Sequence, residues 1–198
     1  MQITADQVKQ LREMTGAGMM ECKKALAEAL GDLEKAVDGL RKSGAAKVEK
    51  RSGRTANEGR VQAYIHPGDR VGVLIEVNCE TDFVARTDEF GQLVRNLAMQ
   101  AAAAGAEFVR REEVAAERVA REREILLAQA DLSGKPPAIV EKIIEGKLNK
   151  FFAEVCLLEQ TYIRDDKRTV ADIVQEFAAK TGENIVVRRF TRFRLGQE

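Results

Sequence analysis

The sequence predicts an α+β protein, with helices in its N-terminal part followed by a small antiparallel sheet that further helices cover. Three observations predict this class. Apolar residues recur at helical spacing in several windows, two runs rich in β-branched residues flank a turn at residues 67–69, and 32% of the 198 residues are charged while only 5% are aromatic. Such a composition is typical of long solvated helices around a modest core. The length leaves room for one ordinary domain and a smaller one.

The first 44 residues predict a bundle of three short helices. Thr4 and Gln7 form a capping box that satisfies two backbone donors at a helix start, so a first helix should cover residues 5–14. Glycines permit a positive φ and end this helix, and a second helix follows. A third helix, capped by Asp32, should end by Gly44. The apolar residues expected to meet in the bundle are Val8, Leu11, Cys22, Ala25, Leu26, Ala29, Leu33, Ala36, Val37 and Leu40.

Residues 45–60 predict a basic linker to a core domain at residues 61–198. From Lys47 to Arg60 apolar residues become few, and five Lys or Arg stand against only two Glu. A solvated helical or flexible connector explains this composition. Contact with phosphate or with an acidic partner is the alternative.

A β-hairpin should open the core domain. Runs at residues 61–66 and 70–78, the second rich in β-branched residues, flank the turn Pro67-Gly68-Asp69. Apolar residues from Phe90 to Ala101 then recur at helical spacing, which predicts an amphipathic helix packed on the sheet.

The rest of the core domain predicts a helical pair, a helix and a strand. Two charged helical stretches, residues 117–130 and 136–159, are separated by a short polar segment that contains a glycine. They predict an antiparallel helical hairpin, at about residues 117–159, that projects from the core. A helix that Thr169 caps and Gly182 ends should lead to a last strand at residues 184–195.

Most enzyme classes lack their required groups in this sequence. A phosphate-binding loop ending in GK[ST], a dinucleotide GxGxxG pattern and a GxSxG elbow are all missing. His66 is the only histidine, and the three cysteines lack the paired spacing of a zinc site or a disulfide framework. We therefore expect no enzyme, no cofactor and no bound metal. An enzyme that uses Cys79 or His66 is the distant alternative.

The same features predict where the protein works. Unpaired cysteines are typical of a reduced, cytoplasmic protein. No apolar run approaches the roughly 18 residues that a membrane span needs, and the first nine residues lack the basic and then apolar order of an export signal. Lys plus Arg and Asp plus Glu number 32 each, so the total charge does not indicate a polyanion as main partner. We expect a cytoplasmic protein with no membrane partner and no direct nucleic-acid partner.

Two motifs carry side chains that suit a binding surface. Met19 and Met20 stand at a helix start beside a glycine-rich turn, where thioethers can fill either a core or a protein interface. Residues 81–84, Thr-Asp-Phe-Val, follow an apolar strand and place a carboxylate beside a large aromatic. The structural alternative is that the threonine or the aspartate caps a short helix while the phenylalanine packs inward.

The last strand supplies a competing function. Residues 185–194 interleave four arginines with two phenylalanines, a pattern that can bind phosphates and stack on bases. Alternation along a strand places Phe190 and Phe193 on opposite faces, so they form no single platform. An RNA-binding, ribosome-associated factor stays the alternative function, and a half-buried sheet with exposed arginines is the structural alternative.

The chain resembles one known family along most of its length. Residues 11–26 are LREMTGAGMMECKKAL and residues 77–86 are VNCETDFVAR. Residues 133–136, SGKP, and residues 182–190, GENIVVRRF, extend the similarity. The sequence resembles the short bacterial form of the elongation factor Ts family, with the first motif in its N-terminal module and the second in its nucleotide-exchange segment.

The resemblance implies a fold and a partner. The fold is a ubiquitin-associated-like domain of three helices, a linker, and an α+β core with a helical hairpin. The partner is the GTPase elongation factor Tu, whose GTP-binding domain the N-terminal module grips. The positions that match this contact are Arg12, Met19, Met20 and Lys23.

The resemblance also implies a mechanism of nucleotide exchange. Thr81, Asp82, Phe83 and Val84 match the family's TDFV segment, which lodges near the nucleotide bound to elongation factor Tu. Phe83 would act as a wedge, and Asp82 would disturb the surroundings of the magnesium ion that bridges the partner to the phosphates. This ion belongs to the partner. The factor would promote GDP release, make or break no bond, and stay bound until GTP binds.

Longer family members contain two related core subdomains, whereas this chain has residues for one. A second copy of the chain can supply the missing half by two-fold pairing. We therefore expect a homodimer that binds two molecules of elongation factor Tu.

Overall fold

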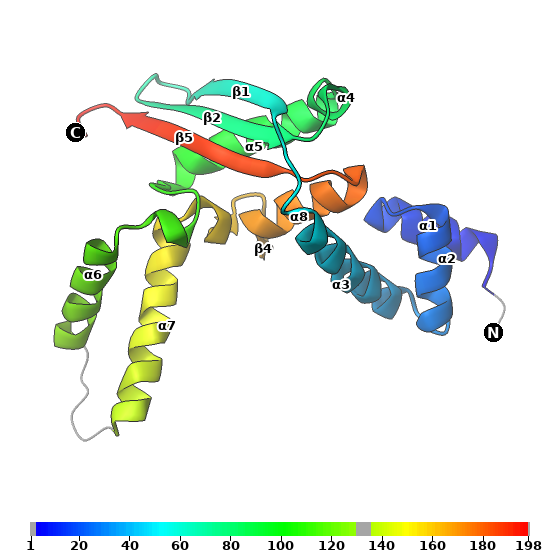
Figure 1. Ribbon diagram of the computed structural model, residues 1–198, viewed down its shortest axis with the longest axis horizontal. Helices are drawn as coiled ribbons and strands as arrows, with labels where there is room; N and C mark the ends of the chain where they lie inside the picture. The colour runs from blue at the N-terminus through cyan, green and yellow to red at the C-terminus, as the bar shows by residue number, and fades with distance from the viewer. Residues whose placement is uncertain (1–2, 130–135, 198) are drawn as a thin grey trace. The chain divides into compact units, whose positions relative to one another are not determined.

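The computed structural model describes residues 3–129 and 136–197, and it confirms the predicted α+β class (Figure 1). The chain divides into two compact units. One contains residues 1–59, 78–86 and 172–186, and the other contains residues 60–77, 87–171 and 187–198. The segment 131–135, predicted as the turn of the helical hairpin, lies outside the described residues, as do three of the four residues of the SGKP motif.

The first unit begins with three packed helices, α1 (Ala5–Thr15), α2 (Met19–Glu28) and α3 (Leu33–Arg51). The predicted capping box starts α1. Thr4 Oγ1 accepts a hydrogen bond from the Gln7 N–H at 3.3 Å, and Gln7 Oε1 accepts one from the Thr4 N–H at 3.0 Å. Gly16 ends the helix in the left-handed conformation, at φ 67°. The buried core of the bundle consists of predicted residues, namely Val8, Leu11, Cys22, Ala25, Leu26 and Ala36.

Helix α3 is longer than predicted, because it passes through Gly44 and ends at Arg51. A glycine inside a helix weakens it by about 1 kcal/mol, which is too little to end a helix when the following residues favour it. The predicted end at Gly44 is therefore wrong, and the first part of the basic stretch 45–60 is helical. The division of the chain into residues 1–44, 45–60 and 61–198 stays a prediction.

The main sheet contains β1 (Glu58–Ile65), β2 (Val71–Cys79) and β5 (Val186–Arg194), in the order β1-β2-β5. The predicted hairpin turn is present, because the His66 N–H donates to the Val71 carbonyl at 2.9 Å. Helix α5 (Asp88–Ala104) covers one face of the sheet (Figure 1). The side chains buried in these elements include Val73, Ile75 and Val77 of β2 and Phe90, Val94, Leu97 and Ala101 of α5.

The predicted helical hairpin is also present, as α6 (Ala116–Gln129) and α7 (Pro137–Val155), which lie side by side and antiparallel (Figure 1). An ion pair between Arg123 and Glu141 joins them. At their base, the Arg118 guanidinium donates to the Glu107 carboxylate at 2.6 and 3.0 Å and lies 5.3 Å from the centre of the Phe108 ring. These hydrogen bonds lower the pKa of Glu107, so the contact is present at neutral pH and weakens as pH falls through that lowered pKa.

Several short elements were not predicted. They are the 3-10 turns η1 (Arg111–Glu113) and η2 (Leu157–Glu159) and the antiparallel pair β3 (Thr161–Tyr162) and β4 (Asp165–Thr169). The sequence of β4 is almost entirely charged, which hides it from a search for apolar alternation. Helix α8 (Val170–Thr181) begins directly after Thr169 and ends just before Gly182, which has a φ of 77°, in agreement with the predicted bounds.

Candidate functional site

The TDFV segment, residues 81–84, leaves the end of β2 and turns at once into the four-residue helix α4 (Asp82–Ala85). Thr81 caps this helix, because its Oγ1 accepts a hydrogen bond from the Val84 N–H at 3.4 Å. The structural alternative is therefore right about the cap. It is wrong about the phenylalanine, because Phe83 is 81% exposed.

Asp82 lies beside Phe83 on the same turn. Its carboxylate is partly exposed and forms an ion pair of 3.0 Å with Arg86. A surface pair of this kind contributes little to folding stability, so Asp82 is not required to hold the turn together. Ala85 is buried and faces the interior. The carboxylate and the aromatic ring are thus both accessible to a partner molecule.

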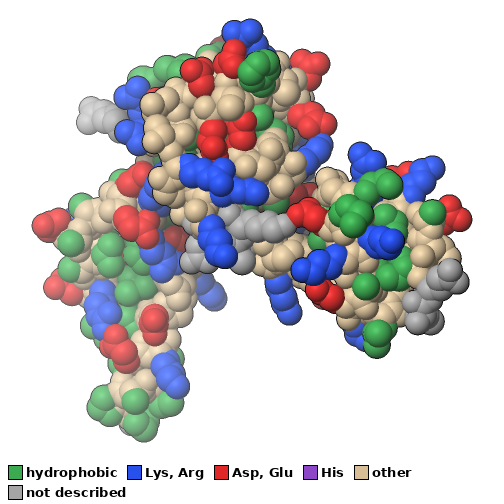
Figure 2. All heavy atoms as spheres, turned by 45° about the vertical axis from the view of Figure 1, so that its right-hand side comes forward, with side chains coloured by type: hydrophobic (Ala, Val, Ile, Leu, Met, Phe, Trp, Pro, Cys, Tyr) green, Lys and Arg blue, Asp and Glu red, His purple; other side chains and the backbone are tan. Residues whose placement is uncertain are grey.

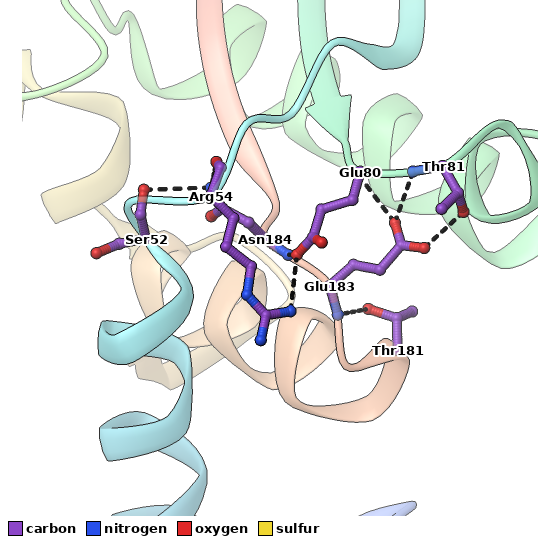
Figure 3. A network of polar contacts seen from close by, with 7 residues as sticks. All are labelled: Ser52, Arg54, Glu80, Thr81, Thr181, Glu183 and Asn184. Atoms are coloured by element: carbon purple, nitrogen blue, oxygen red, sulfur yellow. Dashed lines mark hydrogen bonds and ion pairs between the residues drawn. The ribbon is translucent and has the colours of Figure 1, made fainter.

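Two carboxylates tie the start of the TDFV segment to the loop between α8 and β5 (Figure 3). Glu183 Oε2 accepts hydrogen bonds from the N–H groups of Glu80 and Thr81 at 3.0 and 3.2 Å. Glu183 Oε1 accepts one from the Thr81 hydroxyl at 2.6 Å. In the opposite direction, Glu80 Oε1 accepts one from the Asn184 N–H at 2.6 Å. The segment is therefore held by residues more than one hundred positions away in the chain.

Asn184 extends this network to the end of α3. Its side chain is buried and donates to the carbonyls of Ser52 and Arg54 at 3.2 and 2.8 Å, and the Arg54 guanidinium lies 3.5 Å from the Glu80 carboxylate (Figure 3). Sequence reasoning did not identify Glu80, Glu183 or Asn184 as site residues. Their motifs belong to the family resemblance, but only the fold places residue 183 beside residue 81.

The four N-terminal residues that match the family's partner contact are all exposed; we call Arg12, Met19, Met20 and Lys23 the α1–α2 patch. Met19 is 59% and Met20 is 76% exposed. The interpretation of these methionines as core residues is therefore wrong, and their role in a protein interface stays a prediction. Figure 2, in which this end of the molecule comes forward, shows hydrophobic side chains beside Lys and Arg on the surface.

Comparison with known proteins decides the family. The family model described as Elongation factor TS matches residues 3–197. The chain belongs to the elongation factor Ts family. Elongation factor Ts of Moorella thermoacetica is 61% identical over 195 residues, which cover 98% of this chain and 96% of that protein.

Two further members of the elongation factor Ts family are similarly close. Elongation factor Ts of Carboxydothermus hydrogenoformans is 60% identical over 195 residues, 98% of this chain and 90% of that protein. Elongation factor Ts of Thermotoga maritima is 59% identical over 197 residues, 100% of this chain and 98% of that protein. The predicted family is confirmed, and the chain is a translation elongation factor.

The catalytic alternative would use Cys79 or His66 of this chain. Cys79 is fully buried, and its Sγ donates to the Thr81 carbonyl at 3.2 Å. Burial, and after it the Glu183 carboxylate, raise the pKa of Cys79 to about 11, so the thiol stays protonated at neutral pH. His66 is exposed in the hairpin turn, with Nδ1 3.1 Å from the Tyr64 hydroxyl. In the described part of the chain, no group of three or more His, Cys, Asp or Glu is placed to hold a metal ion.

The arginine-rich strand β5 bears on the RNA-binding alternative. Phe190 is partly buried whereas Phe193 is 70% exposed, as expected for residues on opposite faces. Arg189 forms an ion pair with Glu76 of β2 at 2.7 Å, so its charge is partly compensated.

Among residues 3–129 and 136–197, no helix is both long enough and apolar enough to cross a membrane.

Proposed function

We propose that this chain is a guanine-nucleotide exchange factor for elongation factor Tu, and that it is not an enzyme. The observation that carries the proposal is the 81% exposure of Phe83 on a helix that Thr81 caps and Glu183 holds. A single exposed apolar side chain is ordinary on a protein surface. An aromatic ring presented on a turn fixed by several hydrogen bonds is prepared for contact with another molecule. Membership of the elongation factor Ts family supports elongation factor Tu as that molecule.

The mechanism acts on a binding equilibrium. In the complex, Phe83 enters the surroundings of the bound nucleotide as a wedge, and Asp82 brings a negative charge near the partner's magnesium ion. Both effects destabilise the GDP-bound state relative to the nucleotide-free state. Because the coupling between factor and nucleotide is reciprocal, GTP in excess then displaces the factor. No covalent bond is made or broken.

Binding to elongation factor Tu uses a surface separate from the TDFV segment. The α1–α2 patch binds the GTP-binding domain of elongation factor Tu, with Met19 and Met20 as adaptable apolar contacts and Arg12 and Lys23 as charged ones. The protonated state of Cys79, with its pKa of about 11, supports the non-enzymatic part of the proposal.

Release of labelled GDP from elongation factor Tu tests the proposed function. We expect the chain to accelerate release, with a rate that saturates as its concentration rises, above the baseline that a chase with unlabelled GDP alone sets. A release rate that stayed at this baseline would show that the proposed function is wrong. Titration with labelled RNA at two salt concentrations addresses the alternative, because affinity that rests on phosphate contacts falls steeply with salt.

We further propose a homodimer joined through the outer face of the main sheet, opposite α5. Ile65 lies on the same face as Gly72, since Ile65 Cδ1 is 2.9 Å from the place that a Cβ on Gly72 would take. Leu74 is two residues from Gly72 in β2, so its side chain lies on this face too. Its exposed apolar residues are Val61 at 65%, Ile65 at 59%, Leu74 at 50% and Phe193 at 70%.

Phe193 belongs to the same face through a separate contact. Arg189 pairs with Glu76, and Glu76 is two residues from Leu74, so both lie on the outer side of β2. Phe193 is four residues from Arg189 and therefore lies on the same side of β5 as Arg189. All three strands therefore contribute to one apolar surface. A second copy of the chain is its best occupant, because two-fold pairing buries identical faces on both copies and provides the second core that longer family members carry. The dimer would bind two molecules of elongation factor Tu.

Light scattering tests the dimer. We expect a particle of about twice 22.0 kDa at micromolar concentration. Leu74→Glu should give a folded monomer, because the side chain is half exposed in one chain and a buried charge disfavours the pairing. Ile139→Glu, on α7 away from this face, is the control and should remain a dimer. A wild-type chain that stayed monomeric at this concentration would contradict the proposal.

A further inference from the structure

We propose that Glu183 is a positioning residue for nucleotide exchange, a role that rests on the function proposed above. Its carboxylate accepts three hydrogen bonds from two consecutive residues, from the N–H groups of Glu80 and Thr81 and from the Thr81 hydroxyl. Two of these hydrogen bonds come from Thr81, the first residue of the TDFV segment, and the third comes from Glu80 directly before it (Figure 3). Glu183 would not touch the nucleotide itself, and it would act through Thr81 on Asp82 and Phe83.

The TDFV segment needs such support because α4 has only four residues. A helix of one turn is unstable on its own, since the cost of ordering its backbone exceeds the gain from its single turn of hydrogen bonds. The two residues before α4 have left the strand, and Glu183 accepts the hydrogen bonds that their N–H groups donate. A wedge held on an unsupported turn would lose the fixed geometry that it needs.

Glu183 also orients the helix cap. The Thr81 hydroxyl donates a hydrogen bond to Glu183 Oε1 at 2.6 Å. Its oxygen lone pairs are thereby left for the Val84 N–H, which donates to Thr81 Oγ1 at 3.4 Å. One carboxylate thus fixes the backbone before α4 and the side chain that caps it. Glu80 and Asn184 tie the same two segments in the opposite direction, through a hydrogen bond of 2.6 Å.

This geometry separates the roles of length and charge at position 183. Glu183→Ala removes all three contacts. Glu183→Asp keeps the charge but is one methylene shorter, so it cannot reach both residues. Glu183→Gln loses the charge but keeps an oxygen for the two N–H groups, and its amide can donate to the Thr81 hydroxyl. A positioning role therefore predicts that glutamine replaces glutamate better than aspartate does.

The test measures GDP release from elongation factor Tu over a range of factor concentrations. For Glu183→Ala and Glu183→Asp we expect a maximal release rate lower by roughly tenfold or more, with an unchanged half-saturating concentration because docking uses the α1–α2 patch. Glu183→Gln should stay within a few-fold of wild type. Glu154→Ala, an exposed glutamate on α7, is the control and should behave as wild type.

A second measurement needs no partner. Amide hydrogen exchange at Thr81 and Val84 should be faster in Glu183→Ala than in wild type, and amides in α5 should be unchanged. Unaltered release rates in Glu183→Ala, or a defect in Glu183→Gln with full activity in Glu183→Asp, would overturn the proposal, the second by assigning the effect to charge. If the wild-type chain did not accelerate GDP release from elongation factor Tu, the proposed function would be wrong. Faster amide exchange in Glu183→Ala would then show that the Glu183 contact has a structural role only.

Discussion

Replacement of Phe83 by alanine should remove most of the exchange activity and leave the melting temperature unchanged. Phe83 is 81% exposed, and truncation of a surface side chain typically changes the free energy of unfolding by no more than about 0.5 kcal/mol. The wedge contact with elongation factor Tu would nevertheless be lost. A central aromatic contact of this kind carries enough binding energy for the maximal rate of GDP release to fall by roughly a hundredfold.

The matched control for this variant is Phe90→Ala. Phe90 is fully buried in α5, so its truncation should cost about 3 to 5 kcal/mol and lower the melting temperature by roughly 6 to 20 °C. Thermal melts and stopped-flow GDP release on both variants compare the two positions directly. Asp82→Ala should slow release less than Phe83→Ala, since its contribution is electrostatic. A Phe83→Ala protein that melted as early as Phe90→Ala, or that kept wild-type release, would remove the wedge role.

The second large effect is expected at the docking surface. Met19→Ala combined with Met20→Ala should weaken binding to elongation factor Tu by roughly a hundredfold, because two apolar contacts of the α1–α2 patch would be lost together. The methionines are 59% and 76% exposed, so the bundle should stay folded. At saturating concentration the maximal rate of GDP release should equal that of wild type, which separates docking from exchange.

Leu30→Ala provides the control for the docking prediction. Leu30 follows α2 and is 77% exposed, but it is not one of the four matched positions. Calorimetric titration against nucleotide-free elongation factor Tu should give this variant wild-type affinity. Equal affinities for the double methionine variant and wild type would place the docking surface elsewhere on the chain.

Local signals allowed much of the fold to be predicted from the sequence. The cap at Thr4, the turn at Pro67-Gly68-Asp69 and the β-branched run of β2 each involve residues close in the chain, and each forms the predicted element in the structure. The end of α3 was predicted wrongly because a glycine is a weak stop, and tertiary context decides whether the helix continues. The pair β3 and β4 was missed because its charged residues carry no apolar alternation.

The exposed residues of the candidate site could be predicted from the sequence, but the residues that hold them in place could not. Phe83 and the methionines of α2 were identified because a motif of consecutive residues matches a family, whereas composition alone favoured burial for Phe83. The hydrogen bonds that the N–H groups of residues 80 and 81 donate to Glu183 join positions 103 and 102 apart, and no periodicity or spacing encodes such a contact. Only the folded chain brings together the end of β2 and the loop after α8.

The contact between Thr81 and Glu183 also sets an order of events during synthesis. The 102 positions that separate them take about 5 to 20 s to translate, at about 5 to 20 residues per second. Throughout this interval the nascent chain already contains Asp82 and Phe83, but it lacks the carboxylate that holds their turn. Helices α1 and α2, to which we assign docking, are complete even earlier. Under the proposed roles, a growing chain therefore completes its docking surface well before the turn that carries Phe83 is fixed, because that turn cannot become rigid until residue 183 has been synthesised.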